Sequence, residues 1–366
     1  MLARAAVLDN PEAKFAVRDV ELREPGPGEV LVAVHAAGIC HTDITARRSP
    51  IPLAFPIVLG HEGAGVVEAV GAGVATVSPG DRVVLTYDSC GHCHNCRTGQ
   101  SAYCAEFFAR NLTGRAPDGS TPLRCGDQAI SGCWFGQSSF GTYALVGERA
   151  VVKVGDELPF EELAPLGCGI QTGAGAVVHT LGLRLGESIA VYGAGAVGLA
   201  AVMAAHASGA REVVAVDLHP GRLELALELG ATRVFDGADP DLARQVLSAT
   251  AGCDYALDTT GVPAVMDTAL TALRSRGTLG IVGTAAPRLG LSTGAMATKR
   301  VKFLFEGDAV PHEFIPQLIA LRLAGRLPFD RLITTFALDA INDAEAASVD
   351  GSVVKPVLLT DVSSTR

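Results

Sequence analysis

A chain of 366 residues is too long for one ordinary domain and long enough for two. Hydrophobic residues make up 48% of it and charged residues 19%, which supports a sizeable core and excludes extensive disorder. The formal net charge of −10 argues against nucleic acid as the main partner and fits a soluble cytosolic protein.

The first residues and the longer apolar segments indicate neither export nor a membrane. The apolar residues at the start are soon interrupted by Asp9, Asn10 and Pro11, so they are too few for the apolar region of a signal peptide. Later apolar segments are broken by Gly, His or charge before they reach membrane-spanning length. We therefore expect a cytoplasmic protein whose nine cysteines are mostly reduced, and clustered cysteines then indicate a metal.

Strands and loops are expected over the first 150 residues. The segment 29–38, EVLVAVHAAG, is rich in valine and follows the turn-forming sequence PGPG. The segments 63–74 and 81–86 continue this β pattern, and each is bounded by Gly, Pro or Asp. This part of the chain should therefore be mostly β.

From about residue 186 the sequence changes to repeated strand–helix units. Short apolar runs predict strands at 187–193, 211–217, 232–236, 254–258 and 277–283, with helices near 196–208 and 220–229. Strands that alternate with helices in this way form a parallel sheet covered on both faces. Beyond residue 305 the pattern predicts a helix over 312–325 and a final strand over 353–360.

A glycine-rich loop follows the first of these strands and leads directly into a helix. Its glycines, Gly193, Gly195 and Gly198, have the GxGxxG spacing, and Asp217 stands at the end of the next strand. The first glycine allows a tight turn, the second lets a pyrophosphate reach the helix N-terminus, and the third lets helix and strand pack closely. Asp217 would accept hydrogen bonds from the adenosine ribose and repel a 2′-phosphate. The loop therefore predicts NAD rather than NADP.

Four cysteines have the spacing C-x2-C-x2-C-x7-C: Cys90, Cys93, Cys96 and Cys104. Disulfides are disfavoured by the expected compartment and by the two-residue gaps. The bacterial ferredoxin pattern for an iron–sulfur cluster closes with a shorter gap and a proline, whereas Ala105 follows here. Tetrahedral zinc bound by four thiolates fits best, and because no ligand position stays open, such a site is structural. His92 and His94 are then solvated loop residues.

Three further motifs follow one another along the chain: GICHTD at 38–43, LGHEGAGVVEAVG at 59–71 and LGCGIQTGAGA at 166–176. Together with the cysteine loop and the glycine loop, they resemble the zinc-dependent medium-chain alcohol dehydrogenases over essentially the whole chain.

The resemblance implies an α/β protein in which a Rossmann domain, a doubly wound parallel sheet, is inserted in a mostly β, GroES-like catalytic domain. The catalytic zinc-binding domain would comprise residues 1–160 and 306–366, and the NAD-binding domain residues 161–305. The active site would then lie in the cleft between the two domains.

Residues matched to the family's motifs imply a catalytic zinc site. Cys40, His61 and Cys168 would bind this zinc and leave its fourth position open for water or the substrate oxygen. Glu62 matches a glutamate that can approach the metal during ligand exchange, and a buried carboxylate paired with a nearby cation is an equal alternative. The resemblance thus implies two zinc ions per chain, one catalytic and one structural.

Two neighbours of Cys40 would support the catalysis. Asp43 matches the carboxylate that orients the imidazole of His61. Thr42 matches the hydroxyl that bonds the substrate oxygen and starts a proton relay. Several relatives end this relay on a histidine three positions later, where this chain has Thr45. The proton would leave through the ribose and water, or through another group.

The resemblance also implies contacts to the NAD cofactor. His41 and Lys355 match positions that touch the pyrophosphate, Thr172 and Val197 match residues against the nicotinamide, and Arg222 matches a cation near the adenosine ribose. These side chains would complete the cofactor site around the glycine loop.

Aromatic residues indicate the substrate. Trp134, the only tryptophan, and Phe135 fall in the family segment that lines the substrate channel. The stretches 103–114 and 136–146 look most like the aryl-alcohol (benzyl-alcohol) dehydrogenase branch. We therefore expect reversible hydride transfer between an aromatic or allylic primary alcohol and NAD+, giving the aldehyde.

Two alternatives stay open from the sequence. One is a thiol-adduct-dependent formaldehyde dehydrogenase or nitrosothiol reductase of the same family, and the other is an NAD-binding protein with a vestigial catalytic zinc site. In each case we expect a small-molecule ligand and no nucleic acid or membrane partner, and the resemblance implies a homodimer or homotetramer.

Overall fold

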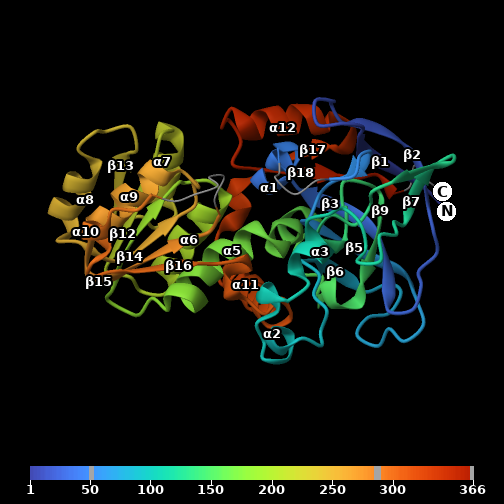
Figure 1. Ribbon diagram of the computed structural model, residues 1–366, viewed down its shortest axis with the longest axis horizontal. Helices are drawn as coiled ribbons and strands as arrows, with labels where there is room; N and C mark the ends of the chain where they lie inside the picture. The colour runs from blue at the N-terminus through green and yellow to red at the C-terminus, as the bar shows by residue number, and fades with distance from the viewer. Residues whose placement is uncertain (49–52, 284–289, 363–366) are drawn as a thin grey trace. The chain divides into compact units, whose positions relative to one another are not determined.

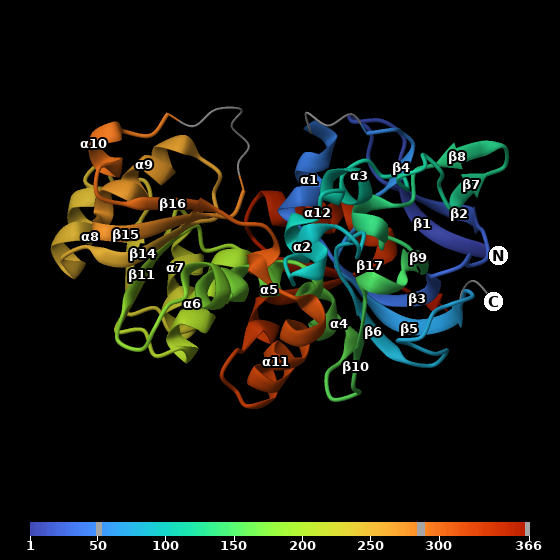
Figure 2. The ribbon, with the colours of Figure 1, turned by 60° about the horizontal axis from the view of Figure 1, so that its bottom comes forward.

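The computed structural model describes residues 1–48, 53–283 and 290–362 (Figures 1 and 2). The chain forms two compact units. The first consists of Met1–Cys168, Val310–Ile319 and Asp330–Arg366, and the second of Gly169–Ala309 and Ala320–Phe329. The catalytic and NAD-binding domains expected at 1–160 with 306–366 and at 161–305 stay a prediction.

The larger sheet of the first unit has the strand order β10–β6–β5–β3–β18–β17, with β9 also paired to β3. Its strands are β3 Glu29–Gly38, β5 Gly63–Val70, β6 Arg82–Leu85, β9 Tyr143–Gly147, β10 Val151–Val154, β17 Ile333–Ala337 and β18 Lys355–Leu359. The ten-residue strand β3 pairs with β5, β9 and β18, and its side chains are buried along most of its length in the apolar core. Its valines are therefore core residues, as a strand buried on both faces requires.

A second sheet of the first unit has the order β4–β1–β2–β7–β8. Its strands are β1 Leu2–Leu8, β2 Ala16–Leu22, β4 Ile57–Val58, β7 Leu123–Cys125 and β8 Gln128–Ile130. The helices of this unit include α1 His41–Thr45, α2 His94–Arg97, α3 Phe107–Asn111, α4 Phe160–Leu163 and α12 Ile341–Val349. Side chains from both sheets contribute to one apolar core, which also holds Trp134. The mostly β character predicted for this part of the chain is confirmed.

The second unit is built on a six-stranded parallel sheet in the order β13–β12–β11–β14–β15–β16. Its strands are β11 Ser188–Tyr192, β12 Glu212–Asp217, β13 Arg233–Asp236, β14 Cys253–Asp258, β15 Leu273–Ile281 and β16 Arg300–Phe303. Its helices are α5 Gly169–Gly175, α6 Ala196–Ala207, α7 Pro220–Glu228, α8 Leu242–Thr250, α9 Pro263–Ala272 and α10 Thr293–Met296, while α11 Pro311–Leu323 belongs in part to each unit. Figure 2 shows α9 and α10 on one face of the sheet and α6 on the other. The predicted doubly wound parallel sheet is confirmed.

All strands and helices predicted beyond residue 186 occur, within a few residues of their expected ends. The largest difference is at β15, which begins at Leu273 rather than at residue 277, because its pairing with β14 shifts register between Cys253 and Tyr255. The strands β16 and β17 and the helices α8, α9, α10 and α12 were not predicted. Strand β16 is short and mostly exposed at the edge of the sheet, so its sequence lacks the apolar run of the central strands.

Within the described residues, no helix combines the length and the apolar composition needed to cross a membrane.

The glycine loop closes tightly between β11 and α6. Gly193 has a φ of +94°, a conformation that favours glycine. A Cβ atom at Gly198 would lie 1.8 Å from the backbone oxygen of Gly193, whereas a Cβ at Gly195 would meet no heavy atom within 4 Å. The first and third glycines are thus needed for the turn and its packing, and the second leaves open space.

Replacing Gly198 or Gly195 by alanine should distinguish a glycine that close packing requires from one that faces open space. Gly198→Ala forces a methyl group against backbone that cannot move aside, so it should lower the free energy of unfolding by about 1–3 kcal/mol. Gly195→Ala serves as the matched control and should leave stability within ~0.5 kcal/mol of wild type. Denaturant unfolding without added nucleotide measures both, and equal losses for the two variants would contradict this account of the loop.

Candidate active site and metal centres

The four-cysteine loop brings four sulfur atoms together. The Sγ atoms of Cys90, Cys93, Cys96 and Cys104 lie within 4.8 Å of one another. Backbone groups support this arrangement, since Cys93 N–H donates to Cys90 Sγ at 3.3 Å and Cys90 N–H donates to Cys104 Sγ at 3.3 Å. All nine cysteines of the chain are free thiols. Four sulfur donors this close together suit a tetrahedral zinc site.

Hydrogen bonding and burial act in opposite directions on these thiols. The N–H groups of Ala105 and Cys96 lower the pKa of Cys93 to about 6, whereas burial raises the pKa of Cys104 to about 12. A divalent cation would stabilise all four thiolates at once. His92 and His94 are exposed, and a ring nitrogen of His92 lies 3.3 Å from a Glu106 oxygen.

A second group of ligand atoms comes from three separate segments of the first unit. Cys40 stands directly before α1, and His61 follows Gly60, whose φ is +92°. The ligand atoms of Cys40, His61 and Cys168 lie within 4.8 Å of one another. Nε2 of His61 is buried without a hydrogen-bond partner among the described residues. A buried imidazole nitrogen beside two sulfur atoms is a donor set that suits zinc and leaves a fourth position open.

Charge interactions connect Cys40 with His61. A hydrogen bond with Cys168 and the nearby His61 bring the pKa of Cys40 well below its usual value, although burial opposes them. Burial disfavours charge on His61, but Asp43 and Cys40 together raise the pKa of His61 well above its usual value. Negative charge therefore surrounds the His61 ring. A bound metal cation would stabilise this charge in place of the proton of the imidazolium.

The carboxylate of Asp43 is buried and accepts hydrogen bonds from four groups. Its Oδ1 lies 2.8 Å from Nδ1 of His61 and 3.1 Å from the N–H of Gly60, and its Oδ2 accepts from the N–H of Cys40 at 3.1 Å. The fourth donor is Nε1 of Trp134, 2.9 Å from Oδ1. Asp43 thus contacts both the Cys40 segment and the His61 ring.

The two aromatic residues expected in a substrate channel lie against this network. Trp134 is 2% exposed, and its indole N–H reaches Asp43. The Phe135 ring stacks on the His61 ring, with centroids 4.3 Å apart and an interplanar angle of 21°. Neither contact was predicted from the sequence, because Trp134 and Asp43 are 91 positions apart and no local pattern indicates which buried acceptor an indole will find. A contact of either ring with substrate stays a prediction.

Glu62 and Lys355 form a buried ion pair. Lys355 Nζ lies 2.8 and 2.9 Å from the two carboxylate oxygens of Glu62 and also donates to the backbone oxygen of Ile39 at 3.2 Å. Burial raises the pKa of Glu62 against the effect of Lys355, while the Glu62 charge raises the pKa of Lys355 against burial. The paired carboxylate foreseen as the alternative to a metal ligand is thus present in the structure. Its cation, Lys355, was expected at the pyrophosphate.

The residues around Cys40 differ in exposure. Thr42 is partly buried, and its Oγ1 lies 3.7 Å from Cys40 Sγ. Thr45 is exposed, and its hydroxyl donates to the backbone oxygen of His41 at 3.0 Å. His41 is exposed. The structure therefore places the Thr42 hydroxyl beside the candidate metal ligand Cys40, whereas position 45 carries an exposed threonine hydroxyl instead of an imidazole.

The glycine loop and Asp217 contact one another directly. Ala194 N–H donates to Oδ2 of Asp217 at 2.6 Å, and His219 N–H donates to Oδ1 at 2.9 Å. The hydroxyl of Thr259, a residue not predicted from the sequence, donates to the backbone oxygen of Gly193 at 3.0 Å. Its position directly after β14 was the available signal, because strand ends of a parallel sheet meet at one edge.

Three further residues expected at the cofactor lie on three helices of the second unit. Thr172 is buried on α5, and its hydroxyl lies 3.5 Å from Oε2 of Glu306. A Cβ at Gly173 would lie 2.0 Å from the backbone oxygen of Val197, so α5 packs closely against the start of α6. Arg222 is partly buried on α7. The two residues expected at the nicotinamide therefore lie on neighbouring segments.

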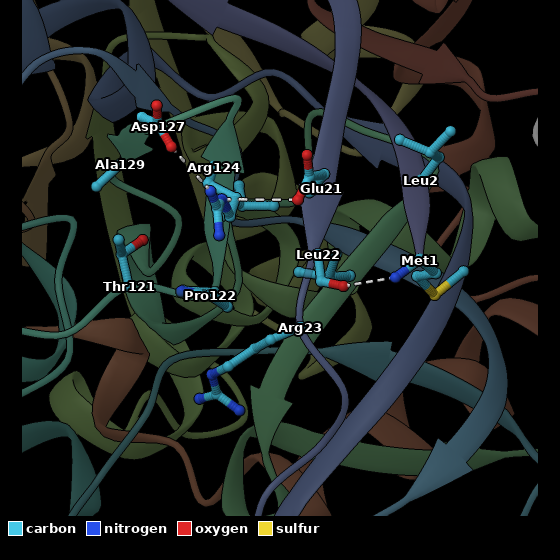
Figure 3. Close-up of a pocket in the computed structure, with 11 residues that line it drawn as sticks. Met1, Leu2, Glu21, Leu22, Arg23, Thr121, Pro122, Arg124, Asp127 and Ala129 are labelled. Atoms are coloured by element: carbon cyan, nitrogen blue, oxygen red, sulfur yellow. Dashed lines mark hydrogen bonds and ion pairs between the residues drawn. The ribbon is translucent and has the colours of Figure 1, made fainter.

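A surface hollow elsewhere in the first unit contains none of these residues (Figure 3). The hollow is lined by Met1, Leu2, Glu21, Leu22, Arg23, Thr121, Pro122, Leu123, Arg124, Asp127 and Ala129. Arg124 forms ion pairs with Glu21 at 3.6 Å and with Asp127 at 3.5 Å across it. These long and exposed pairs are weak.

Two protein-family models match the chain. Residues 26–156 match the alcohol dehydrogenase GroES-like domain, and residues 196–321 match the zinc-binding dehydrogenase family. The first match confirms the GroES-like fold predicted for the mostly β unit.

Whole-length relatives agree with these matches. Geraniol dehydrogenase of Castellaniella defragrans is 45% identical over 98% of this chain and 97% of its own. The crystal structure of benzyl alcohol dehydrogenase from Acinetobacter calcoaceticus is 40% identical, with a TM-score of 0.95 over 99% of this chain and all of the other. An S-(hydroxymethyl)glutathione dehydrogenase of Escherichia coli is 35% identical over 98% of this chain and all of its own.

Removing one sulfur ligand from each centre should have different effects. Cys93→Ala should lower thermal stability and solubility, because a structural zinc contributes on the order of 10 kcal/mol to folding. Cys40→Ala should remain folded and bind NAD, but turn over little substrate. Thermal unfolding, nucleotide binding and zinc content measure these outcomes. Unfolding of Cys40→Ala, or wild-type stability of Cys93→Ala, would contradict the two roles.

Removing Lys355 should destabilise the protein by leaving the Glu62 carboxylate buried without its cation. Lys355→Met should lower the free energy of unfolding by about 3–5 kcal/mol, whereas the double variant Glu62→Gln, Lys355→Met should lose much less. Urea unfolding measures both. A Lys355→Met variant that keeps wild-type stability and only binds NAD more weakly would show instead that the lysine serves the pyrophosphate.

Proposed function

This chain belongs to the zinc-dependent medium-chain alcohol dehydrogenase family, and from that premise we propose that it transfers a hydride between an aromatic or allylic primary alcohol and NAD+, giving the aldehyde. The observation that carries the proposal is the group formed by Cys40, His61 and Cys168, whose ligand atoms lie within 4.8 Å of one another. When bound there, zinc would supply Lewis acidity toward the substrate oxygen.

The chain's own residues would prepare the site for this chemistry. Asp43, 2.8 Å from Nδ1 of His61, keeps the proton on that nitrogen and leaves Nε2 free for the metal. The Thr42 hydroxyl, beside Cys40 Sγ, would hold the substrate hydroxyl and take its proton. Thr45 offers a hydroxyl rather than an imidazole, so the proton would leave toward the cofactor ribose or water.

The second unit supports the NAD part of the proposal. The glycine loop leaves open space at Gly195, where a pyrophosphate would approach the N-terminus of α6. Asp217 is held in place by the N–H groups of Ala194 and His219, and its carboxylate would bind ribose hydroxyls and repel the 2′-phosphate of NADP. NAD, as hydride acceptor, carries the redox chemistry when bound.

Two relatives support the substrate class. The name of one relative specifies geraniol, an allylic alcohol, and that of the other benzyl alcohol, an aromatic one. An aromatic substrate ring gains about 0.5–1.5 kcal/mol beyond simple burial for each aromatic side chain it contacts. Phe135 beside His61 is such a side chain close to the proposed zinc ligands.

A thiol-adduct substrate is the second candidate. It is favoured by the 35% identity to S-(hydroxymethyl)glutathione dehydrogenase, which extends over 98% of this chain. The lower identity, compared with 45% for geraniol dehydrogenase, makes it the runner-up. An NAD-binding protein with a vestigial zinc site is disfavoured, because the proposed ligands and Thr42 all lie together.

We also propose a cytoplasmic homodimer or homotetramer. The free thiols of both cysteine groups fit a reducing compartment, and the oligomeric state is an expectation from the family that sedimentation equilibrium measures.

A substrate panel tests the proposal. NADH formation should be compared for benzyl alcohol, cinnamyl alcohol, geraniol, ethanol and S-(hydroxymethyl)glutathione, with Cys40→Ala as the inactive control. The unsaturated alcohols should exceed ethanol in kcat/KM by roughly tenfold or more, as one or two ring contacts predict. Highest turnover of the thiol adduct would support the runner-up, and no turnover of any compound in the panel would contradict both.

A further inference from the structure

We propose that Trp134 is a positioning residue of the catalytic metal centre: its indole N–H holds the Asp43 carboxylate in the orientation that presents Nε2 of His61 to the metal. The inference rests on the zinc site proposed above. It assigns to Trp134 a role in retaining the metal, while the substrate contact expected from the sequence stays a prediction.

The first step of the argument is the geometry of Asp43. Its Oδ1 accepts from Trp134 Nε1 at 2.9 Å and lies 2.8 Å from Nδ1 of His61. The remaining donors, Gly60 N–H and Cys40 N–H, belong to the backbone. Among the described residues, the side chains that donate to this carboxylate are therefore the His61 ring, which the carboxylate orients, and the Trp134 indole, which holds the carboxylate in place.

The second step is the burial of the donor and the acceptor. Trp134 and Asp43 are each 2% exposed, so water is not at hand to replace the indole N–H. A buried carboxylate interacts strongly with each donor because little solvent screens it. Losing one donor should let the carboxylate rotate, and the His61 ring would turn with it.

The third step is the anchoring of Trp134 itself. Its backbone N–H donates to Oγ of Ser138 at 2.9 Å, and that hydroxyl donates to the backbone oxygen of Val58 at 2.7 Å. Phe135 has a φ of +49° and stacks on the His61 ring. Two adjacent residues thus contact the carboxylate and the face of the imidazole, and the loop that carries them is tied to the strand before His61.

Zinc retention tests the proposal with a readout other than turnover. In Trp134→Phe, which keeps an aromatic ring but lacks the N–H donor, zinc should pass from this site to a chromogenic chelator roughly tenfold faster. The phase that belongs to this site is the one missing from Cys40→Ala. Phe140→Leu is the matched control, since Phe140 is equally buried and packs edge-on against Phe15. Its zinc should leave at the wild-type rate.

A double-mutant cycle tests whether Trp134 acts through Asp43. Asp43→Ala should itself accelerate zinc release, and adding Trp134→Phe in that background should change the rate no further. Unaltered release from Trp134→Phe, acceleration in Phe140→Leu as large as in Trp134→Phe, or additive effects in the cycle would each overturn the proposal.

A second measurement leaves Trp134 unchanged and so does not depend on the stability of a Trp134 variant. Trp134 is the only tryptophan of the chain, so its fluorescence reports on this one position. Asp43→Ala removes the acceptor of the indole N–H and should shift the emission maximum, whereas identical spectra would overturn the proposal. Wild-type protein that holds zinc at the four-cysteine loop alone would instead contradict the proposed function.

Discussion

The hydrogen bonding of one buried carboxylate connects the parts of the candidate active site. Asp43 accepts from the backbone before α1, from the backbone before His61, from the His61 ring and from the Trp134 indole. These donors come from segments far apart in the chain, and each would be costly to bury without an acceptor. Formation of the site therefore depends on the correct strand register in this part of the β unit, in which the donors hold the metal ligands at fixed positions.

A second buried carboxylate, that of Glu62, is paired with a buried cation. Glu62, the residue after His61, pairs with Lys355 and so joins the strand β18 to the segment before β5. A Cβ at Gly38 would lie 2.0 Å from a Glu62 oxygen, so the glycine is needed to admit the carboxylate. Cys40, with a pKa well below its usual value, adds further negative charge. A divalent cation is the natural complement to such a site, as the zinc-dependent family would require.

Much of this could be predicted from the sequence because the signals are local. The apolar runs of β11, β12 and β14, the spacing of Gly193 and Gly198, and the four clustered cysteines each occupy a short stretch. The indole contact of Trp134 and the pairing of Lys355 with Glu62 could not be predicted, because each joins residues 91 or 293 positions apart. Such contacts are decided by the strand pairing and packing of the whole unit, and a motif match to the cofactor or substrate does not reveal them.

Zinc K-edge X-ray absorption of the purified protein tests the central claim, that this chain holds one all-sulfur zinc and one zinc bound by two sulfurs and an imidazole. Averaged over both sites, and with a water oxygen in the open fourth position of the second, the account predicts about three sulfur neighbours near ~2.3 Å and about one nitrogen or oxygen neighbour near ~2.0 Å per zinc. Four sulfur neighbours with no nitrogen or oxygen would contradict it, because they would mean that zinc occupies the four-cysteine loop alone and that the Cys40, His61 and Cys168 group binds none.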